Sequence, residues 1–405
     1  MLVVQKFGGS SVANAERIFN VANRIIETYN KGNDVVVILS AQGDTTDELI
    51  EKAHEINPNP SKRELDMLLS TGEQQSVALM AMALQKLGYN AVSLNAAQVG
   101  IITTSVYGNA KIKTVGKERI MQELSRKNIV LITGFQGINR YDDITTLGRG
   151  GSDTSAVAIA AVLNAGLCEI YTDVDGVYTA DPRIVKDARK LDMISYDEMA
   201  ELASLGAKVL HTRSVEVAQK YNVELVVRSS LTRAEGTIVK GEYGVEKMLV
   251  SGVASDKEQA IITIEGITDT PGRVFKLFSM LERENISVDI IVQSNKAEDI
   301  SFTVVSADVP SVMEVLEKNK AALGAKNIMF EDKVAKVSIV GAGMATHPGV
   351  ASLMFEALYD AGVNIKMIST SEIKISVVVD ERDVENAVYS IHEKFNLASK
   401  NMRKS

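Results

Sequence analysis

The chain of 405 residues contains no tryptophan, one cysteine and only four histidines. The single cysteine, Cys168, excludes an internal disulfide, and its place in an apolar, strand-like run predicts a buried and unreactive thiol. The histidines, His54, His211, His347 and His392, lack the spacing of metal ligands. We therefore expect structural roles for all four and predict no metal site built by the chain.

Long apolar runs and basic clusters are also absent. The longest weakly polar run, Ser155 to Cys168, is too short to span a bilayer, and no basic region followed by an apolar one appears at the N-terminus. A formal charge of −8 without a basic patch argues against a surface for nucleic acid or for an anionic membrane. We expect a cytoplasmic protein whose partners are small molecules and copies of itself.

The first 240 residues alternate short β-rich runs with helical stretches, which is typical of an α/β fold with a mainly parallel sheet covered by helices. Long helices are expected over Val12 to Tyr29 and Glu64 to Leu87. A charged, glycine-containing stretch from Arg233 to Glu246 predicts a domain boundary. The expected strands are Leu2 to Gln5, Val35 to Ser40, Ala91 to Leu94, Ile129 to Thr133, Glu169 to Thr172 and Glu224 to Val227.

Two glycine-rich turns stand between expected strands and helices. The sequence KFGGSS begins at Lys6, and the sequence TTLGRGGSDT precedes the apolar run Ser155 to Leu163, which predicts a helix. Backbone N–H groups of such a turn, together with the positive end of the helix, can bind a phosphate. Arg149 adds a planar charged group suited to carboxylate or phosphate, and Asp153 lies beside it in the sequence.

Neither turn has the spacing of a P-loop or of the three-glycine dinucleotide fingerprint. One such turn alone could equally be an ordinary connection between a strand and a helix, without a binding role. The acidic segment Thr172 to Arg183 does not fit a calcium loop, because its glycine is the fourth residue from Asp173 instead of the sixth and no bidentate glutamate follows. The motifs by themselves indicate anion binding outside the common nucleotide folds.

The C-terminal part contains an internal repeat. Thr270-Pro-Gly272 recurs as His347-Pro-Gly349, an offset of 77 residues. Each copy reads as strand, Pro-Gly turn, helix, strand, hairpin and strand. Ile262 to Ile264 and Val337 to Ile339 open the copies, and Ile300 to Val305 and Ile373 to Val378 supply hairpin strands.

The two turns, together with the segment Thr172 to Arg183, resemble the amino acid kinase family, and within it the aspartate kinases. The matching motifs are KFGGSS at 6–11, SAQGDTTDEL at 40–49, TGEQ at 71–74, FQG at 135–137, TTLGRGGSDTSA at 145–156, YTDVDGVYTADPR at 171–183 and AKVLH at 207–211. They occur in the family's order and approximate spacing. The C-terminal repeat is similar to tandem ACT domains, which are regulatory βαββαβ modules that bind amino acids.

This resemblance implies a three-layer amino acid kinase fold over residues 1–240, followed by two α+β ACT domains. The first ACT domain is expected at 260–332. The second is expected to combine 333–405 with the strand Met248 to Ala254, so that the first is inserted within it.

The resemblance also implies transfer of the ATP γ-phosphate to the side-chain carboxylate of L-aspartate, which opens lysine, threonine and methionine biosynthesis. A carboxylate with a pKa of about 4 is already ionised at neutral pH, so the reaction needs no general base. It needs an in-line arrangement and positive charge around the transferring phosphoryl group. Lysines, backbone N–H groups and Mg²⁺ bound with ATP supply that charge.

Lys6 and Asp153 are the implied catalytic residues, with Lys6 at the phosphates and Asp153 orienting lysines and substrate. The implied aspartate-binding residues are Ser40, Thr46, Asp47, Glu73, Arg149, Gly150, Gly151 and Ser152, with Arg149 at a carboxylate and Glu73 at the amino group. The implied ATP-binding residues are Lys6, Gly8, Gly9, Ser10, Thr172, Asp173, Tyr178, Asp181, Arg183 and Lys208. From the residues alone, Asp47 could instead be a helix N-terminal charge, Lys208 a surface lysine and Tyr178 a core residue.

The resemblance places an effector site in the ACT repeats. Its residues are Asp269, Pro271, Gly272, Arg273, Val274, Val288, Asp289 and Gln293, with Asn364, Ile365, Thr370 and Ser371 in the second copy. Lysine is the expected effector, and whether threonine also acts stays open, since Ala351 replaces a frequent hydroxyl residue. ACT modules commonly pair across a homodimer. A kinase with another acceptor, such as glutamate, or a silent amino-acid sensor are the alternatives.

Overall fold

The computed structural model describes residues 1–207, 209–241, 249–267, 272–294, 299–344, 347 and 349–398. The chain forms two compact units. The first consists of Met1–Val177, Lys190–Ser204 and Lys208–Val245, and the second of Tyr178–Arg189, Leu205–Ala207 and Glu246–Ser405. Within the described ranges, none of the helices combines the length and the apolar character that a membrane crossing requires.

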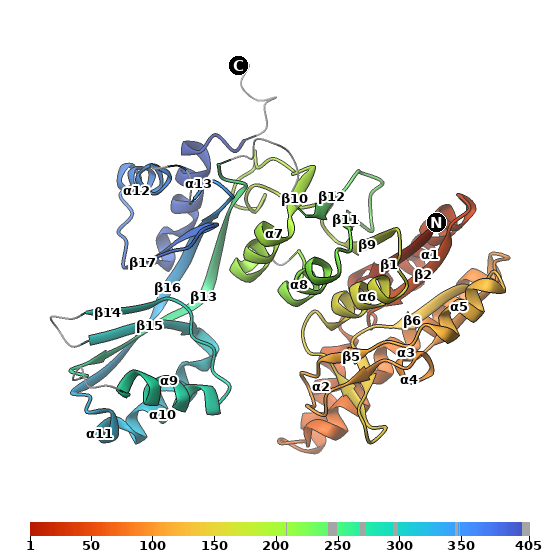
Figure 1. The fold of residues 1–405 in the computed structure, drawn as a ribbon, viewed down its shortest axis with the longest axis horizontal. Helices are drawn as coiled ribbons and strands as arrows, with labels where there is room; N and C mark the ends of the chain where they lie inside the picture. Colours follow the sequence, from red (N-terminus) through yellow and green to blue (C-terminus); the bar gives the residue numbers. More distant parts are fainter. Residues whose placement is uncertain are drawn as a thin grey trace. The chain divides into compact units, whose positions relative to one another are not determined.

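An eight-stranded sheet forms the centre of the first unit (Figure 1). Its strands are β1 (Leu2–Phe7), β2 (Asp34–Leu39), β3 (Ala91–Leu94), β6 (Ile129–Thr133), β9 (Leu167–Thr172), β10 (Met193–Ser195), β11 (Leu225–Ser229) and β12 (Thr237–Lys240). They lie in the order β10-β12-β11-β9-β1-β2-β6-β3, and only the β11 and β12 neighbours are antiparallel. All six expected strands are confirmed, with ends that differ by at most two residues.

Helices lie on both faces of this sheet. They are α1 (Ala15–Asn30), α2 (Thr45–Ile56), α3 (Lys62–Lys86), α4 (Ala96–Val99), α5 (Glu118–Ser125), α6 (Gly151–Val162), α7 (Tyr196–Leu202) and α8 (Thr212–Tyr221). Apolar side chains of α1 and α3 pack with Phe7 of β1. Lys6 instead meets α6, because successive strand residues point to opposite faces. The sheet with helices on each face is the expected mixed α/β architecture.

The two expected long helices are confirmed. α3 covers the predicted range almost unchanged. α1 begins three residues after the predicted Val12, because Gly9–Val12 first form a 3₁₀ turn and the side chain of Asn14 then caps the helix by accepting a hydrogen bond from the Arg17 N–H. The prediction for Cys168 is also confirmed, since this residue is fully buried in β9.

A smaller sheet of four strands lies beside the main one in the first unit. Its strands are β4 (Ile102–Thr103), β5 (Ile112–Thr114), β7 (Gln136–Ile138) and β8 (Ile144–Thr146), in the order β5-β4-β7-β8. The sequence analysis did not predict these strands, which are only two or three residues long. Their position matters because β8 leads directly into the loop before α6.

The second unit contains a six-stranded antiparallel sheet. Its strands are β13 (Gly252–Glu265), β14 (Ile291–Ser294), β15 (Asp299–Val305), β16 (Asn327–Val340), β17 (Met367–Thr370) and β18 (Lys374–Asp380), in the order β14-β15-β13-β16-β18-β17. β13 and β16 are long central strands that pair side by side from one end of the sheet to the other (Figure 1). A register shift after Asp256 divides this pairing into two halves.

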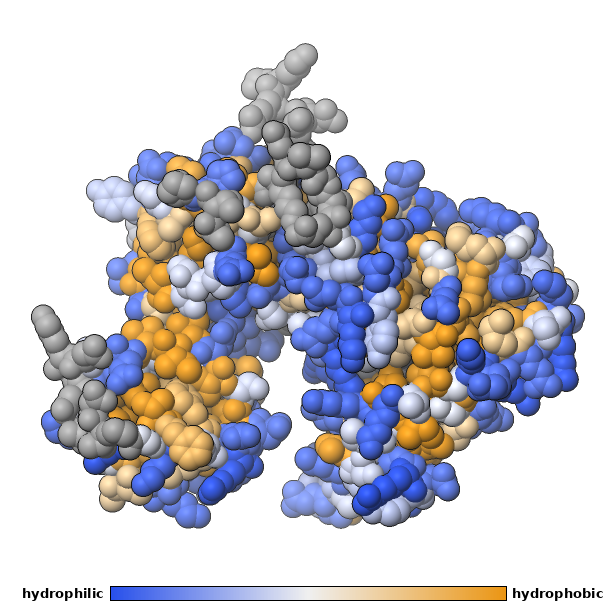
Figure 2. All heavy atoms as spheres, viewed as in Figure 1, coloured by the Kyte–Doolittle hydropathy of each residue, from blue (hydrophilic) through white to orange (hydrophobic). Residues whose placement is uncertain are grey.

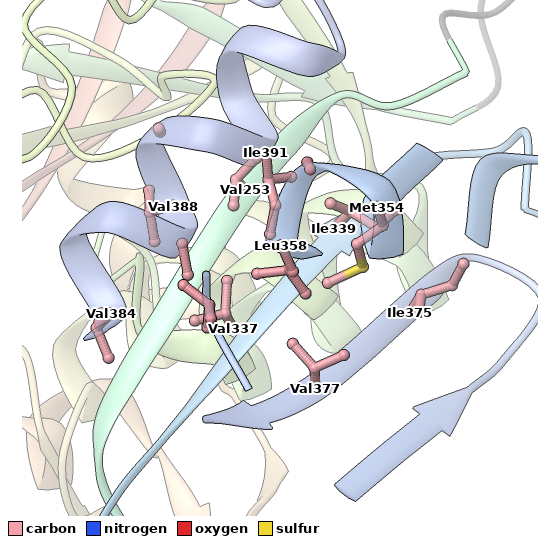
Figure 3. Packing of buried hydrophobic residues seen from close by; sticks show 14 of the residues in the cluster. Val253, Val337, Ile339, Met354, Leu358, Ile375, Val377, Val384, Val388 and Ile391 are labelled. Carbon is pink, nitrogen blue, oxygen red and sulfur yellow. The ribbon is translucent and has the colours of Figure 1, made fainter. Parts of the chain in front are cut away.

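The helices of the second unit are α9 (Arg273–Arg283), α10 (Val309–Lys318), α11 (Lys320–Leu323), α12 (Val350–Asp360) and α13 (Val384–Lys394). They form two separate cores on the sheet. α9 and α10 pack over β13 and β15. Figure 3 shows the second core, in which Met354, Leu358 and Ile391 from α12 and α13 lie against Val337 and neighbouring strand residues. The arrangement repeats one helix pair on each half of the sheet, as the sequence repeat suggests.

The segment Tyr178–Arg189 belongs to a different unit from the one expected from the sequence. It falls inside the predicted kinase range 1–240, whereas the structure groups it with the second unit. The reason is apolar burial, because Val185 and Ala188 belong to the same core as α12 and α13. The hydroxyl of Thr179 lies 2.9 Å from Nε2 of His392 on α13. Of the expected strand Met248 to Ala254, the residues from Gly252 onward belong to β13 and pair with β16, and Met248 lies outside the described residues.

Candidate active site

A cavity of about 260 Å³ lies at the carboxyl ends of β1 and β2. Ligands of open α/β sheets commonly bind at this edge. The cavity is lined by the turn after β1, the segment after β2, α3 and the start of α6. Its lining residues are Lys6, Gly8, Gly9, Ser40, Ala41, Gly43, Thr46, Glu73, Phe135, Gly148, Arg149, Gly150, Gly151, Ser152 and Asp153.

The glycine turn after β1 brings two backbone segments into close contact. The carbonyl of Gly9 accepts a hydrogen bond of 3.0 Å from the N–H of Gly43. A Cβ atom on Gly9 would lie only 2.6 Å from the carbonyl oxygen of Ala41. Glycine is therefore required at this position by the approach of the segment after β2, and the turn exposes backbone to the cavity.

The loop between β8 and α6 carries Arg149, and we call its residues 146–150 the Arg149 loop. Gly150 has a φ of +69°, and a Cβ atom there would lie 2.3 Å from the side chain of His211. The Arg149 side chain is exposed, and the described part of the chain offers it no hydrogen-bond or ion-pair partner. Its planar guanidinium is thus available for an anionic group in the cavity.

α6 begins at Gly151, four residues before the apolar run that predicted it. Gly151, Ser152 and Asp153 form its first turn and line the cavity. Hydrophobicity did not mark this turn because these residues face the cavity as well as the protein interior. The unpaired N–H groups of a helix start favour a bound anion.

Lys6 and Asp153 form an ion pair across the cavity wall. Nζ of Lys6 lies 2.7 Å from Oδ1 of Asp153, and the two side chains are 12% and 11% exposed. At this distance the contact is a charge-assisted pair, and the lysine ammonium has three N–H groups. Asp153 therefore fixes the ammonium of Lys6 by charge while leaving N–H groups of Lys6 available to a ligand.

Glu73 contributes a buried carboxylate from the middle of α3. Its Oε1 accepts a hydrogen bond of 3.1 Å from the Ala41 N–H, whereas Oε2 is buried and has no partner among the described residues. Burial raises the pKa of Glu73 to about 7. A cationic ligand group in the cavity would pair with this carboxylate and favour its ionised form.

The chain matches known families over most of its length. A model of the amino acid kinase family matches residues 1–229, and an ACT domain model matches residues 262–319 and 337–395. Aspartokinase from Bacillus sp. (strain MGA3) is 52% identical over 401 residues, which cover 98% of each chain. The chain belongs to the aspartokinases of the amino acid kinase family.

Solved aspartokinase structures share its fold. E. coli aspartokinase III in complex with aspartate and ADP (R-state) has a TM-score of 0.83, and the same enzyme in complex with lysine and aspartate (T-state) has a TM-score of 0.79. Both are 27% identical and cover 97% of this chain and 99% of their own. The chain is accordingly an enzyme, a phosphotransferase with a carboxyl group as acceptor.

The cavity brings together most of the residues predicted for aspartate. Ser40, Thr46, Glu73, Arg149, Gly150, Gly151 and Ser152 line it, together with Lys6, Gly8, Gly9 and Asp153. Asp47 is not in the lining and lies in the first turn of α2. That is the position of a helix N-terminal charge, the alternative that the sequence left open.

The remaining residues predicted for ATP are not in the lining. Ser10 lies exposed in the 3₁₀ turn, and Thr172 ends β9 with its hydroxyl donating to Asp173 at 2.9 Å. Asp181 and Arg183 form an exposed ion pair of 2.7 Å that lowers the pKa of Asp181, and Tyr178 packs against the second unit's core. Lys208 lies outside the described residues. The roles of all these residues in nucleotide binding stay predictions.

The residues predicted for an effector lie in the second unit. Gly272 has a φ of +92° and starts α9, Arg273 donates to the Leu323 carbonyl at 3.0 Å, and Asp289 forms a 2.5 Å ion pair with Lys336. Asp269 and Pro271 fall outside the described residues. Val274 is exposed on α9, and Val288 packs against the core formed by α9 and α10. Gln293 lies in β14. In the second copy, Asn364 and Ile365 precede β17, Thr370 is its last residue and Ser371 follows it.

Sequence reasoning missed several lining residues and one neighbour of the cavity. Phe135 was part of the quoted FQG motif, and Ala41 and Gly43 belong to SAQGDTTDEL, but no property of these residues singled them out. His211, expected to be structural, packs against Gly150, and burial lowers its pKa. No three His, Cys, Asp or Glu side chains in the described ranges are arranged to hold a metal ion.

Proposed function

We propose that the chain transfers the γ-phosphoryl group of ATP to the side-chain carboxylate of L-aspartate. A carboxylate oxygen attacks the γ-phosphorus, the bond to the β–γ bridging oxygen breaks, and 4-phospho-L-aspartate and ADP are formed. E. coli aspartokinase III, which shares the fold, binds aspartate and ADP.

The observation that carries this proposal is the set of charges in one cavity. Arg149 offers a guanidinium for a carboxylate, Glu73 offers a buried carboxylate for an ammonium, and Lys6 offers positive charge beside the α6 N-terminus. An amino acid with a second carboxylate needs these three partners. With Arg149 and Glu73 holding the backbone groups, the side-chain carboxylate is directed toward Lys6, where the phosphoryl group is transferred.

Mg²⁺ is expected to arrive with ATP. This ion keeps several waters and needs only one or two protein carboxylates beside the phosphate oxygens. Asp153, in the first turn of α6, is a carboxylate in the cavity that could serve it. The bound ion would neutralise charge on the phosphates, while Lys6 and the N–H groups of the glycine turns orient them.

We further propose feedback inhibition by lysine through the ACT repeats, and rates with threonine test for a second effector. E. coli aspartokinase III binds lysine in its T-state structure. By the resemblance, the Gly272 turn at the start of α9 corresponds to the effector turn, and Asp289, just before β14, to the segment that faces it. We also propose a homodimer formed through the ACT sheets. All four residues of the edge strand β14 are exposed, and apolar side chains gather over β15 and its neighbours on the visible face (Figure 2).

Hydroxylamine trapping of the acyl phosphate tests the reaction. The protein is incubated with Mg-ATP and L-aspartate or L-glutamate, and then with lysine and threonine singly and together. Hydroxamate from aspartate alone, suppressed by lysine, is expected. Product from glutamate would contradict the substrate, and no product from either acceptor by folded, lysine-binding protein would indicate a silent sensor.

Variants of the ion pair test the assigned roles. Lys6→Ala and Asp153→Ala should each abolish turnover while the protein stays folded, because each removes part of the charge arrangement at the transferring group. Lys127→Ala is a matched control, since this lysine is 72% exposed and pairs with a surface aspartate. Wild-type turnover in either active-site variant would contradict the role of that residue.

A further inference from the structure

Two charged side chains, one buried and one partly buried, contact the Arg149 loop without lining the cavity. Asp66, on α3, is 1% exposed, and Arg213, on α8, is partly buried. Neither has an ion-pair partner within the described residues. Lys62 and Glu216 are the nearby opposite charges of Asp66 and Arg213, but neither is close enough for an ion pair. A charge held away from water without an ion pair costs stability unless hydrogen bonds satisfy it, so the contacts that these two groups make indicate their role.

Asp66 binds the backbone of two neighbouring segments. Its Oδ2 accepts hydrogen bonds of 2.9 Å from the N–H of Thr146 and 2.9 Å from the N–H of Gly108. Its Oδ1 accepts a 2.7 Å bond from the Thr146 hydroxyl. One carboxylate thus ties the first residue of the Arg149 loop to the segment 108–110.

Arg213 binds the same two segments through their carbonyl groups. Its Nη1 donates to the Leu147 carbonyl at 3.0 Å, and its Nη2 donates to the Ala110 carbonyl at 2.7 Å. The segments are also joined directly, because the Ala110 N–H donates to the Thr146 carbonyl at 2.9 Å. The Asp66 carboxylate therefore accepts hydrogen bonds from one N–H group of each segment. The Arg213 guanidinium donates to one carbonyl group of each segment.

We propose that Asp66 and Arg213 are positioning residues that hold the Arg149 loop in the conformation in which Arg149 meets the acceptor's carboxylate. The inference rests on the proposed function, because that function gives Arg149 its ligand. Leu147 is two residues from Arg149, and Gly148, between them, has a φ of +78°. With Thr146 and Leu147 fixed on one side and His211 packed on Gly150 on the other, the backbone of Arg149 is held at the cavity before substrate arrives.

The burial of the two charges supports this role. Burial raises the pKa of Asp66, and partial burial lowers that of Arg213, so both charged forms lose some contact with water at some cost. A pair of neutral side chains would avoid that cost but would give weaker hydrogen bonds to the loop, since bonds to ionised groups are roughly twice as strong.

Steady-state kinetics of Asp66→Asn and Arg213→Lys test the proposal. The Asn amide keeps one oxygen for the two backbone N–H groups but loses the negative charge and turns its NH2 group to the Thr146 hydroxyl, so its bonds to the loop are weaker. The lysine ammonium cannot reproduce the two-carbonyl fork. We expect KM for the acceptor to rise by about tenfold or more in each variant, with KM for ATP unchanged. Matched controls are Glu64→Gln, 65% exposed on the same helix as Asp66, and Lys220→Gln, exposed on α8.

A purely structural role predicts a different result. Loss of folded protein would lower the apparent kcat and leave both KM values unchanged, and that outcome would overturn the proposal. If neither variant folds, hydrogen exchange of the wild-type protein decides, because the amides of Thr146 and Gly108 should exchange slowly. Rates typical of exposed loop amides would also overturn it. Hydroxamate formed from aspartate by the wild type tests the proposed function separately, whichever result the variants give.

Discussion

Lys6 and Asp153 depend on each other for stability as well as for activity. Their charges lie 2.7 Å apart with little exposure, so removing one leaves the other largely uncompensated. We expect Lys6→Met to lower the free energy of unfolding by about 3 kcal/mol, and Lys6→Met with Asp153→Asn to recover part of that loss. Urea unfolding of the single and double variants measures this.

The surface pair of Lys127 and Asp34 provides the comparison. These side chains are 72% and 46% exposed and their charged atoms lie 3.5 Å apart, so Lys127→Met should change the free energy of unfolding by about 0.5 kcal/mol or less. A double active-site variant no more stable than Lys6→Met alone would show that the two charges do not compensate each other. Both active-site variants should remain inactive, which separates stability from catalysis.

Glu73 predicts a pH dependence for aspartate binding. Its pKa of about 7 means that the carboxyl becomes protonated as pH falls through that value. A substrate ammonium pairs only with the ionised form, so KM for aspartate should rise as pH falls below about 7, by up to about tenfold per pH unit. Glu73→Gln should have a high KM that no longer changes with pH over this range.

The raised pKa of Glu73 also predicts how the stability of the folded protein changes with pH. Its folded pKa is raised above the usual glutamate value, so its contribution to stability is fully present below about pH 4.5 and is lost as pH rises to about 7. Thermal unfolding at several pH values should show this loss in the wild type and not in Glu73→Gln. Parallel curves for the two proteins would contradict the buried, unpaired carboxylate.

At the scale of elements, the Arg149 loop depends on a glycine for two reasons. Gly150→Ala would put an alanine in a left-handed conformation and its Cβ atom against His211. Gly32, the position of the control variant Gly32→Ala, has a similar φ of +82°, but a Cβ atom added there would have no other atom within 4 Å. Both variants should lose about 1–2 kcal/mol of stability from backbone strain. Only Gly150→Ala should also raise KM for aspartate, by about tenfold or more, because it displaces the loop.

Thermal unfolding and initial rates of both glycine variants distinguish these effects. An unchanged KM in Gly150→Ala would mean that the loop adapts to the added methyl group without moving Arg149. An equal rise of KM in Gly32→Ala would mean that global destabilisation, and not the position of the loop, controls substrate binding.

The elements also show what local sequence can predict. The six expected strands of the main sheet and the helices α1 and α3 were predicted because apolar periodicity and glycine turns act within a few residues. The bond from Thr146 to Asp66 joins residues 80 positions apart, and no local pattern marks that aspartate among its apolar neighbours. The start of α6 was likewise missed, because its first turn is polar and follows from the loop rather than from hydrophobicity.

At the scale of the whole molecule, each compact unit is built from segments that are not contiguous in the sequence. The segment Tyr178–Arg189 lies within the sequence of the kinase part, yet Ala180, Val185 and Ala188 complete the core beneath α12 and α13. Sequence motifs placed this segment with the nucleotide, because the motif continues unbroken from Tyr171 to Arg183. Burial of its apolar side chains is a tertiary property that the motif does not encode.

The edge strand β14 predicts how the molecule assembles. It pairs with β15 on one side only, and Ile291 and Val292 are 53% and 40% exposed. An exposed apolar edge strand with unpaired backbone groups can pair with the same strand of a second copy. Ile291→Lys and Val292→Lys should therefore convert a homodimer to monomer and weaken lysine inhibition, with turnover retained, as measured by sedimentation and by rates with lysine. Val106→Lys, at a 56% exposed position in the first unit, should change neither. Dimers that persist in both β14 variants would place the interface elsewhere.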